Sequence, residues 1–196
     1  MPNLTILIPA AGASSRMRGG DKLLELVGTE PMLRRQAGIA LAVCPDVIVT
    51  LRPDDPDRRT ALSGLNVTIL PIADAATGMA ASIRAGALAV KNTALMILPA
   101  DMPDLAPADL RLLIDAFDQS PDQIIRATSH DGTPGHPVIF PTDCRGDLAL
   151  VTGDQGARAV LLAHNHRVRL IALPDQNATT DLDTPEDWAA WRKVPR

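Results

Sequence analysis

Short apolar runs alternate with amphipathic stretches along much of this chain, and that alternation limits what it can fold into. The first apolar runs predict strands over residues 4–8, 47–51, 67–70 and 94–98. The stretches between them predict helices over residues 31–43, 54–62 and 79–90. Because the runs are apolar at successive positions, we expect strands buried on both faces. Strand and helix in this order predict an α/β fold, a three-layer sandwich with a mostly parallel sheet between helices.

The second half of the chain continues with the same kinds of element in a looser order. A helix is predicted over residues 106–117, strands over 123–128 and 138–140, a helix over 157–164, a strand over 168–173 and a closing helix over 185–193. A polar insertion, residues 129–136, separates the middle pair of strands. The length of 196 residues, without a linker, repeat or low-complexity tract, predicts one domain over residues 1–196.

Composition and charge exclude several classes of protein. The net charge is −4, aromatic residues make up 2% and no basic tract is present, whereas nucleic-acid binders need a cationic footprint and usually stacking rings. No apolar stretch approaches the roughly 20 residues that span a bilayer, and no cationic segment precedes the first apolar run. Cys44 and Cys144 lie far apart without metal-ligand spacing, so a structural disulfide is not expected. We expect a cytoplasmic protein without nucleic-acid or membrane partners.

The segment from Leu4 to Leu24 carries the clearest chemical signal. Its strand ends at Pro9 and continues into small residues, which are followed by cations; the small residues are Ala10, Ala11, Gly12, Ala13, Ser14 and Ser15, and the cations are Arg16, Arg18 and Lys22. Small residues let a phosphate approach backbone N–H groups closely, and cations then hold it. This combination predicts a nucleotide-binding loop, with a solvated surface turn as the alternative.

Two better-known phosphate loops do not fit this segment. A Walker A loop requires G-x-x-x-x-G-K-[ST], but Asp21 separates Gly20 from Lys22, and Leu23 follows the lysine. A dinucleotide fingerprint requires G-x-G-x-x-G at the start of a helix, and the segment after Gly12 lacks its second glycine. A dinucleotide-dependent oxidoreductase is therefore disfavoured.

Carboxylates stand at two positions that suit a metal ion. Asp101 closely follows the fourth apolar run, and Met102-Pro103 prevents that strand from continuing. Ligands of open α/β sheets bind beyond the carboxyl ends of the strands, where Asp101 is a hard oxygen ligand for Mg²⁺; the alternative is a helix N-cap or turn aspartate. Asp181 and Asp183 point to one side if their segment is extended, just before a helix start at Thr184-Pro185.

Six segments, in their order along the chain, resemble one family. They are A-A-G-x-S-x-R-M with K-L-L in the opening loop, G-M-x-x-S-I-x-x-G from Gly78, D-M-P at Asp101, G-H-P at Gly135, G-D-x-G-A-R from Gly153 and D-x-D-T-P-E-D from Asp181. Together they resemble the MobA-like NTP transferase family. Pro9-Ala10-Ala11-Gly12 is similar to the loop of its molybdenum cofactor cytidylyltransferases, whereas guanylyltransferases typically have L-A-G-G. Arg18 departs from the pattern, because a glycine usually stands there.

The resemblance implies a Rossmann-like fold of the nucleotide-diphospho-sugar transferase type and a Mg²⁺-dependent transfer of CMP from CTP to molybdopterin, with pyrophosphate released. It implies catalytic roles for Arg16, Lys22 and Asp101, a metal site of Asp101 with Asp183 or Asp181, and an acceptor site at Gly135, His136 and Pro137. The implied nucleotide-binding residues are Pro9, Ala10, Ala11, Gly12, Ser14, Arg16, Lys22, Gly78 and Ser82.

Other activities of the same loop stay open at this point. The nearest alternatives are transfer from GTP to molybdopterin, or transfer to a sugar or alcohol phosphate. A non-catalytic molybdenum cofactor chaperone is a further alternative, and a molybdoenzyme or its insertion chaperone is an expected partner. Ser82 and His136 also have structural alternatives, a packed helix serine and a structural histidine. The residues alone indicate neither the acceptor nor the oligomeric state.

Overall fold

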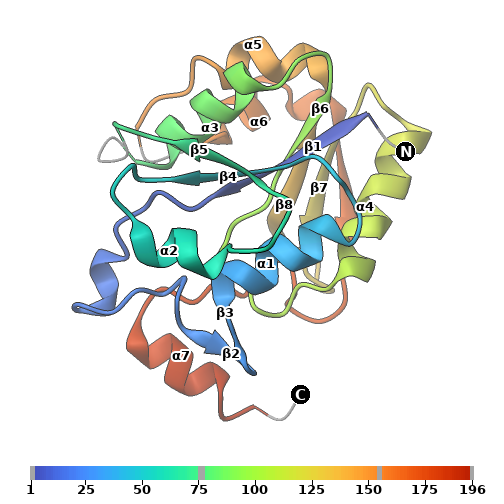
Figure 1. Cartoon of the computed structure of the whole chain (residues 1–196). Coiled ribbons are helices and arrows are strands. Elements are labelled where there is room, and N and C mark those ends of the chain that lie inside the picture. Colours follow the sequence, from blue (N-terminus) through green and yellow to red (C-terminus); the bar gives the residue numbers. More distant parts are fainter. Residues whose placement is uncertain (1–2, 75–77, 154–155, 195–196) are drawn as a thin grey trace.

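A seven-stranded sheet in the order β5-β4-β1-β6-β8-β7-β9 forms the centre of the structure, a computed structural model that describes residues 3–74, 78–153 and 156–194 (Figure 1). The strands are β1 (Leu4–Pro9), β4 (Val47–Leu51), β5 (Thr68–Pro71), β6 (Ala94–Ile97), β7 (Ile124–Thr128), β8 (Pro134–Phe140) and β9 (Val168–Ala172). β8 runs antiparallel to β6 and β7, and the remaining neighbours pair in parallel. The predicted mostly parallel sheet is confirmed.

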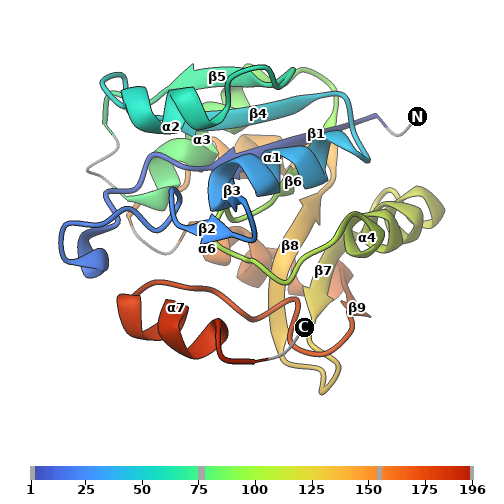
Figure 2. The ribbon, with the colours of Figure 1, turned by 60° about the horizontal axis from the view of Figure 1, so that its bottom comes forward.

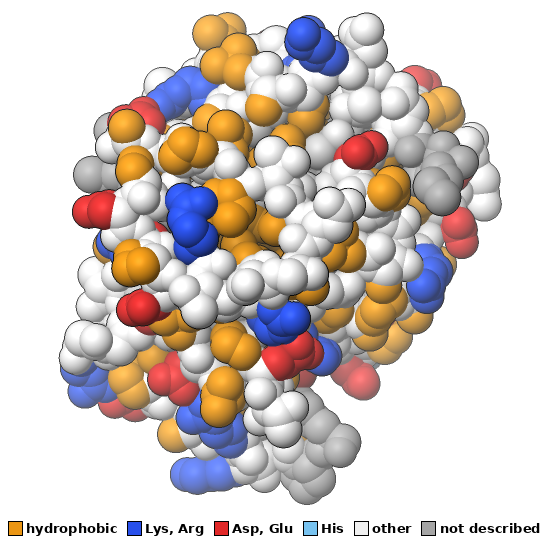
Figure 3. All heavy atoms as spheres, viewed as in Figure 1, with side chains coloured by type: hydrophobic (Ala, Val, Ile, Leu, Met, Phe, Trp, Pro, Cys, Tyr) orange, Lys and Arg blue, Asp and Glu red, His pale blue; other side chains and the backbone are white. Residues whose placement is uncertain are grey.

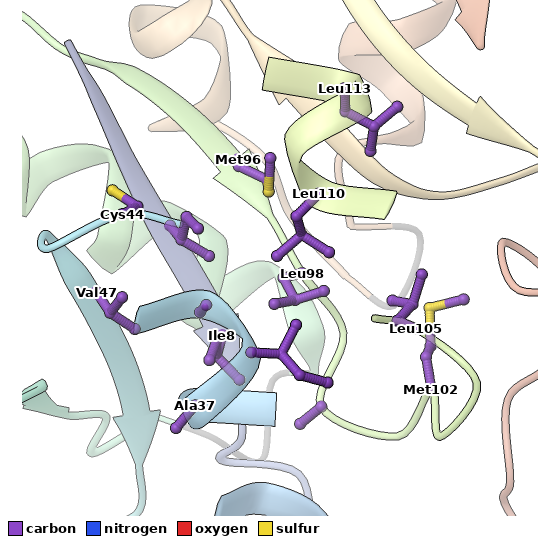
Figure 4. Packing of buried hydrophobic residues seen from close by; sticks show 14 of the residues in the cluster. Ile8, Ala37, Cys44, Val47, Met96, Leu98, Met102, Leu105, Leu110 and Leu113 are labelled. Atoms are coloured by element: carbon purple, nitrogen blue, oxygen red, sulfur yellow. The ribbon is translucent and has the colours of Figure 1, made fainter. Parts of the chain in front are cut away.

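Helices cover both faces of this sheet (Figure 1). One side carries α1 (Met32–Leu41), α2 (Pro56–Ala61) and α4 (Pro107–Gln119), and the other carries α3 (Met79–Ala89), α5 (Arg145–Leu148) and α6 (Arg158–Ala163). Successive β1 residues alternate between the layers, because Ile8 packs in the cluster with α1 and α4, while Leu7 packs with α3. Figure 4 shows the first cluster, in which Ile8 and Leu98 from the sheet side join Ala37 of α1 and Leu110 of α4. The three-layer sandwich is therefore confirmed.

A small outer unit beside the sheet was not predicted in full. β2 (Leu26–Val27) and β3 (Glu30–Pro31) form a short antiparallel hairpin next to α7 (Pro185–Trp191) (Figure 2). Because Pro31 pairs in β3, the helix predicted from residue 31 begins at Met32. The predicted start of the closing helix is confirmed, since the Thr184 hydroxyl accepts from Asp187 N (3.2 Å) and the Asp187 carboxylate accepts from Thr184 N (2.8 Å).

The predicted polar insertion over residues 129–136 is too long, because β8 already begins at Pro134. Gly135 and His136 lie inside this strand rather than in a turn before it. The amide of His136 donates to the carbonyl of Ala178 (2.8 Å), and a Cβ on Gly135 would overlap that same carbonyl. Glycine is thus needed for a close approach of two backbones, and the sequence G-H-P gave no sign of that partner.

Charged and apolar side chains are mixed on the face of the molecule that Figure 3 shows. On that face lysine and arginine side chains occur singly or in small groups among acidic and apolar ones. Within the described ranges, every helix is too short or too polar to cross a membrane.

Candidate active site

A cavity of about 380 Å³ lies at the carboxyl ends of β1 and β6. It is lined by Pro9, Ala10, Ala11, Gly12, Ala13, Ser14, Ser15, Arg16, Lys22, Leu23, Gly78, Met79, Ser82, Pro99, Ala100, Asp101 and Asp183. The fold therefore brings the predicted nucleotide-binding residues and two of the predicted metal ligands to one place. Gly78, with φ +90°, begins α3 at the wall of this cavity. Its predicted neighbour Thr77 lies outside the described residues, as does Asp154 of the G-D-x-G-A-R segment.

The loop after β1 presents backbone amides that make no hydrogen bond to the residues that the structure describes. The amide of Ala10 donates to the backbone oxygen and the hydroxyl of Thr50, both at 3.1 Å. The amides of Ala11, Gly12, Ala13 and Ser14 donate no hydrogen bond to other parts of the chain that the structure describes. Consecutive free N–H groups beside a cavity are the means by which loops bind phosphate oxygens.

Arg58, which no sequence pattern singled out, holds this loop in shape. Its side chain is fully buried and uses all five of its N–H groups. Two bind the carboxylate of Asp21 (2.7 and 2.8 Å), two bind the carbonyls of Ala10 and Gly12 (both 2.7 Å), and one binds the Ser14 hydroxyl (3.0 Å). The guanidinium thereby joins both ends of the loop.

The contacts of Arg58 also change the role expected for Ser14. The Ser14 hydroxyl donates to Asp21 (3.0 Å) and accepts from Arg58, so it is used within the loop. Burial raises the pKa of the Asp21 carboxyl, but the hydrogen bonds and charge of Arg58 outweigh burial and hold that pKa below its ordinary value. Asp21 therefore stays ionised, and Ser14 offers its backbone rather than its side chain to the cavity.

Lys22 lines the cavity and lies between two carboxylates. Its ammonium lies 2.5 Å from Asp101 and 2.6 Å from Asp183, and Arg16 contacts the second Asp183 oxygen at 2.7 Å. Burial lowers the pKa of Lys22, but the two carboxylates, Asp101 first, raise it above its ordinary value. Both carboxylates thus converge on one cation, an arrangement that also suits a divalent metal ion with phosphate oxygens as further ligands.

Backbone contacts fix the two segments that carry the carboxylates. Gln36 of α1, fully buried, donates to the carbonyls of Pro99 and Met102 (both 3.1 Å) on either side of Asp101. The amide of Leu182 donates to the backbone carbonyl of Asp101 (3.2 Å), which joins the C-terminal segment to the end of β6. The backbone at Asp101 is therefore held by two residues that are distant in the sequence, and one of them, Leu182, is the neighbour of Asp183.

Asp181 lies apart from the contact that Asp101 and Asp183 share. Leu182 is buried between Asp181 and Asp183, as expected for an extended segment with both aspartates on its other side. Burial and the negative charges of Asp101 and Asp183 raise the pKa of Asp181, so Asp181 interacts electrostatically with the other two carboxylates. The described residues contain no group of three or more His, Cys, Asp or Glu able to hold a metal. The geometry thus favours Asp101 with Asp183 as the protein's carboxylate pair.

Arg18, the departure from the family pattern, has an identifiable place. Its backbone is in the left-handed region, with φ 52°, which explains why a glycine suits this position. Its exposed side chain forms an ion pair with Glu186 of α7. Together with the pair between Arg16 and Asp183, this contact ties the opening loop to the C-terminal segment.

The three predicted acceptor residues fall in different surroundings. His136 lines a second cavity of about 610 Å³, on the α3 and α6 side of the sheet. Gly135 and Pro137 are buried and line neither cavity. Desolvation, and then the charge of Arg126, lower the pKa of His136 to about 4, although Asp101 partly opposes them. His136 is therefore neutral near pH 7 and offers hydrogen bonds without a charge.

The low pKa of His136 predicts an acid-sensitive fold. The unfolded histidine titrates near 6.5 and the folded one near 4, so its stabilising contribution is full above pH 6.5 and is lost as the pH falls toward 4. We expect the free energy of unfolding to lose about 2 kcal/mol between pH 7 and pH 5 through this group, measured by urea titration. His136→Gln should remove that part of the pH dependence, whereas the exposed control His130→Gln should keep it; equal profiles for both would contradict the assignment.

Known proteins are similar to this chain over nearly its whole length. A family model described as the MobA-like NTP transferase domain matches residues 6–168. A protein of Nostoc sp. named "Probable molybdenum cofactor guanylyltransferase" is 30% identical, over 96% of this chain and 90% of its own. One of the same name from Natronomonas pharaonis is 33% identical, over 95% and 96%. The molybdenum cofactor cytidylyltransferase of Escherichia coli K12 is 27% identical, over 96% and 95%.

Solved structures show the same fold. Rv0371c of Mycobacterium tuberculosis superposes with a TM-score of 0.81 and 26% identity, over 98% of this chain and 99% of that one. A structure of Rv0371C in complex with manganese gives a TM-score of 0.76 at 24% identity, over the same shares. Because the family model covers most of its length and the relatives span nearly all of it, this chain belongs to the MobA-like NTP transferase family.

Proposed function

We propose that this chain transfers CMP from CTP to the terminal phosphate of molybdopterin, forming molybdopterin cytosine dinucleotide and pyrophosphate. The observation that carries the proposal is the first cavity, where free backbone amides, two cations and a converging carboxylate pair meet. These are the groups that a nucleoside triphosphate with a divalent metal ion requires. The relatives named for the molybdenum cofactor support molybdopterin as the acceptor.

The residues supply positioning and charge rather than proton transfer. The loop amides and Arg16 would bind triphosphate oxygens, while Asp101 and Asp183 would hold Mg²⁺. The chemistry that this ion would supply is neutralisation of phosphate charge and Lewis-acid polarisation. An oxygen of the acceptor phosphate forms a bond to the α-phosphorus, the bond from that phosphorus to the bridging oxygen breaks, and pyrophosphate leaves with the electron pair. Lys22 stabilises the charge that develops, and no general base is needed because the acceptor phosphate is already an anion.

The choice between CTP and GTP rests on two different observations. Pro9-Ala10-Ala11-Gly12 resembles the cytidylyltransferase loop, and the Escherichia coli relative carries that activity in its name. The Nostoc and Natronomonas relatives are named guanylyltransferases, which makes GTP the second candidate. In the first cavity Ala11 is buried and packs with Ile72 and Ala81, so its methyl group fixes the loop against α3.

Parallel incubations test the activity and the nucleotide. The full chain is given molybdenum-loaded molybdopterin and Mg²⁺ with either CTP or GTP, and pyrophosphate and the dinucleotide are quantified. We expect pyrophosphate and the cytosine dinucleotide in equal amounts with CTP, and at least tenfold less product with GTP, the order of discrimination that pocket contacts supply. A guanine product in excess would assign the enzyme to GTP. Binding of molybdopterin without pyrophosphate release from either nucleotide would make the chain a carrier and contradict the transfer.

A further inference from the structure

The second cavity contains two arginines that have no acidic partner among the residues that the structure describes. Arg126 of β7 and Arg158, the first residue of α6, both line it. The Arg126 guanidinium donates to the carbonyl of Gly135 (3.2 Å), which fixes its direction. In the described part of the chain neither arginine forms an ion pair with a carboxylate.

The two guanidinium groups line the same cavity and carry like charges. Burial, followed by the positive charge of Arg158, lowers the pKa of Arg126. Like charges beside an apolar cavity destabilise a fold unless an anion joins them. The pair therefore matches a ligand that carries a double negative charge, and guanidinium groups suit phosphate oxygens in particular.

A neutral polar atom and an apolar wall complete the cavity. The Nδ1 atom of His136 is buried and makes no hydrogen bond within the described residues. The remaining wall is apolar, and its members include Ile83, Ile97, Val138, Phe140 and Leu161. Such a surface favours a flat ring over a hydrated chain.

This second cavity adjoins the first. Met79 lines both of them, and the charge of Asp101 acts on His136. A phosphate held near His136 and Arg126 would thus lie in a cavity that shares the Met79 side chain with the first cavity. The arrangement connects an anion site to the place where the α-phosphorus of a nucleotide is expected.

We propose that Arg126 and Arg158 bind the phosphate monoester of the acceptor, with the acceptor's ring against the apolar wall and the free nitrogen of His136 as an additional hydrogen-bonding group. The proposal rests on the proposed function and extends it, because it assigns the acceptor class as a flat heterocycle that carries a phosphate monoester. It names two side chains, Arg126 and Arg158, as acceptor-binding residues.

Charge-removing variants of the full chain test this site. Arg126→Met, Arg158→Met and the double variant are compared with Arg59→Met, which changes an exposed arginine of α2 that lines neither cavity. Molybdopterin binding is measured by equilibrium dialysis without nucleotide, and binding of CTP with Mg²⁺ by calorimetry. We expect each cavity variant to weaken molybdopterin binding about tenfold or more, as loss of a charge-assisted hydrogen bond does, and to leave the Kd for CTP within about twofold. Arg59→Met should behave as the wild type.

Two results would overturn the proposal: a double variant that binds molybdopterin as tightly as the wild type, or one that loses CTP and molybdopterin affinity in equal proportion. If Arg126→Met does not fold, the exposed Arg158→Met carries the same test. The wild type could bind molybdopterin in an arginine-dependent way and still form no dinucleotide. That result would contradict the proposed transfer but support the proposed acceptor site. Normal dinucleotide formation by the double variant, with an unchanged KM for molybdopterin, would contradict the proposed acceptor site but support the proposed transfer.

Discussion

Arg58→Lys is expected to lower the free energy of unfolding by about 3 kcal/mol and to raise the KM for the nucleotide at least tenfold. Lysine keeps the positive charge but has three N–H groups on one nitrogen, whereas Arg58 uses five in a plane. The carbonyls of Ala10 and Gly12 and part of the Asp21 carboxylate would lose their partners while buried or half-buried. The loop amides would then no longer be held in one arrangement for the phosphates.

The neighbouring arginine provides a matched control. Arg59 is exposed on the same helix, so Arg59→Lys should leave both the stability and the KM unchanged. Urea unfolding and steady-state kinetics with varied nucleotide and fixed acceptor measure the two effects. The KM for the acceptor should stay constant in both variants, because Arg58 contacts only the nucleotide loop and its own helix cap. If the Arg58→Lys protein is less stable but has a normal KM for the nucleotide, Arg58 has a purely structural role, and the prediction for the KM is wrong.

Asp101→Asn should reduce kcat about a thousandfold while changing the stability little. An amide of the same shape keeps the turn that Gln36 and Leu182 hold, but it removes the negative charge that a divalent ion needs. Asp115→Asn, on the exposed face of α4, is the control for an ordinary surface aspartate and should leave both kcat and the stability unchanged. Near-normal turnover by Asp101→Asn, with its fold verified by thermal unfolding, would remove Asp101 from the metal site.

Lys22→Met provides the complementary measurement. The variant should also lose transfer, because the cation that stabilises the departing pyrophosphate is gone. It should nevertheless bind Mn²⁺ more tightly than the wild type in the absence of nucleotide, since the ammonium no longer occupies the point where Asp101 and Asp183 converge. Calorimetry with Mn²⁺ alone measures this difference, and weaker binding by the variant would contradict a shared position for lysine and metal.

Local patterns in the sequence were sufficient for most of the fold. β4 has the predicted bounds, and β1, β6 and α3 differ from prediction by a single end residue, because continuous apolar runs and alanine-rich helices are local signals. The short hairpin of β2 and β3 was not predicted because strands of two residues are too short to show an apolar pattern. β8 was predicted too short because its first residue, Pro134, pairs with Thr128 of β7 beyond a register irregularity that the sequence pattern does not show.

The candidate site was predictable to the extent that its residues carry unusual chemistry in an ordered motif. Lys22, Asp101 and Asp183 meet as their motifs suggested, since the carboxyl ends of neighbouring parallel strands share one edge. Arg58 was not predictable: in the sequence it stands beside Arg59 in a short polar helix, and only the fold shows which of the two is buried. Arg158 belongs to the G-D-x-G-A-R segment that the sequence singled out, but only the tertiary structure brings Arg126 into the same cavity.

The ion pairs from Arg16 to Asp183 and from Arg18 to Glu186 join the opening loop to a segment close to the end of the 196-residue chain. During synthesis the N-terminal strands and helices emerge before Asp183 and Glu186 and can begin to fold without them. The candidate active site therefore closes only when this later segment joins the sheet, and a polypeptide truncated after Leu173 would keep all seven strands of the sheet while lacking the Asp183 carboxylate.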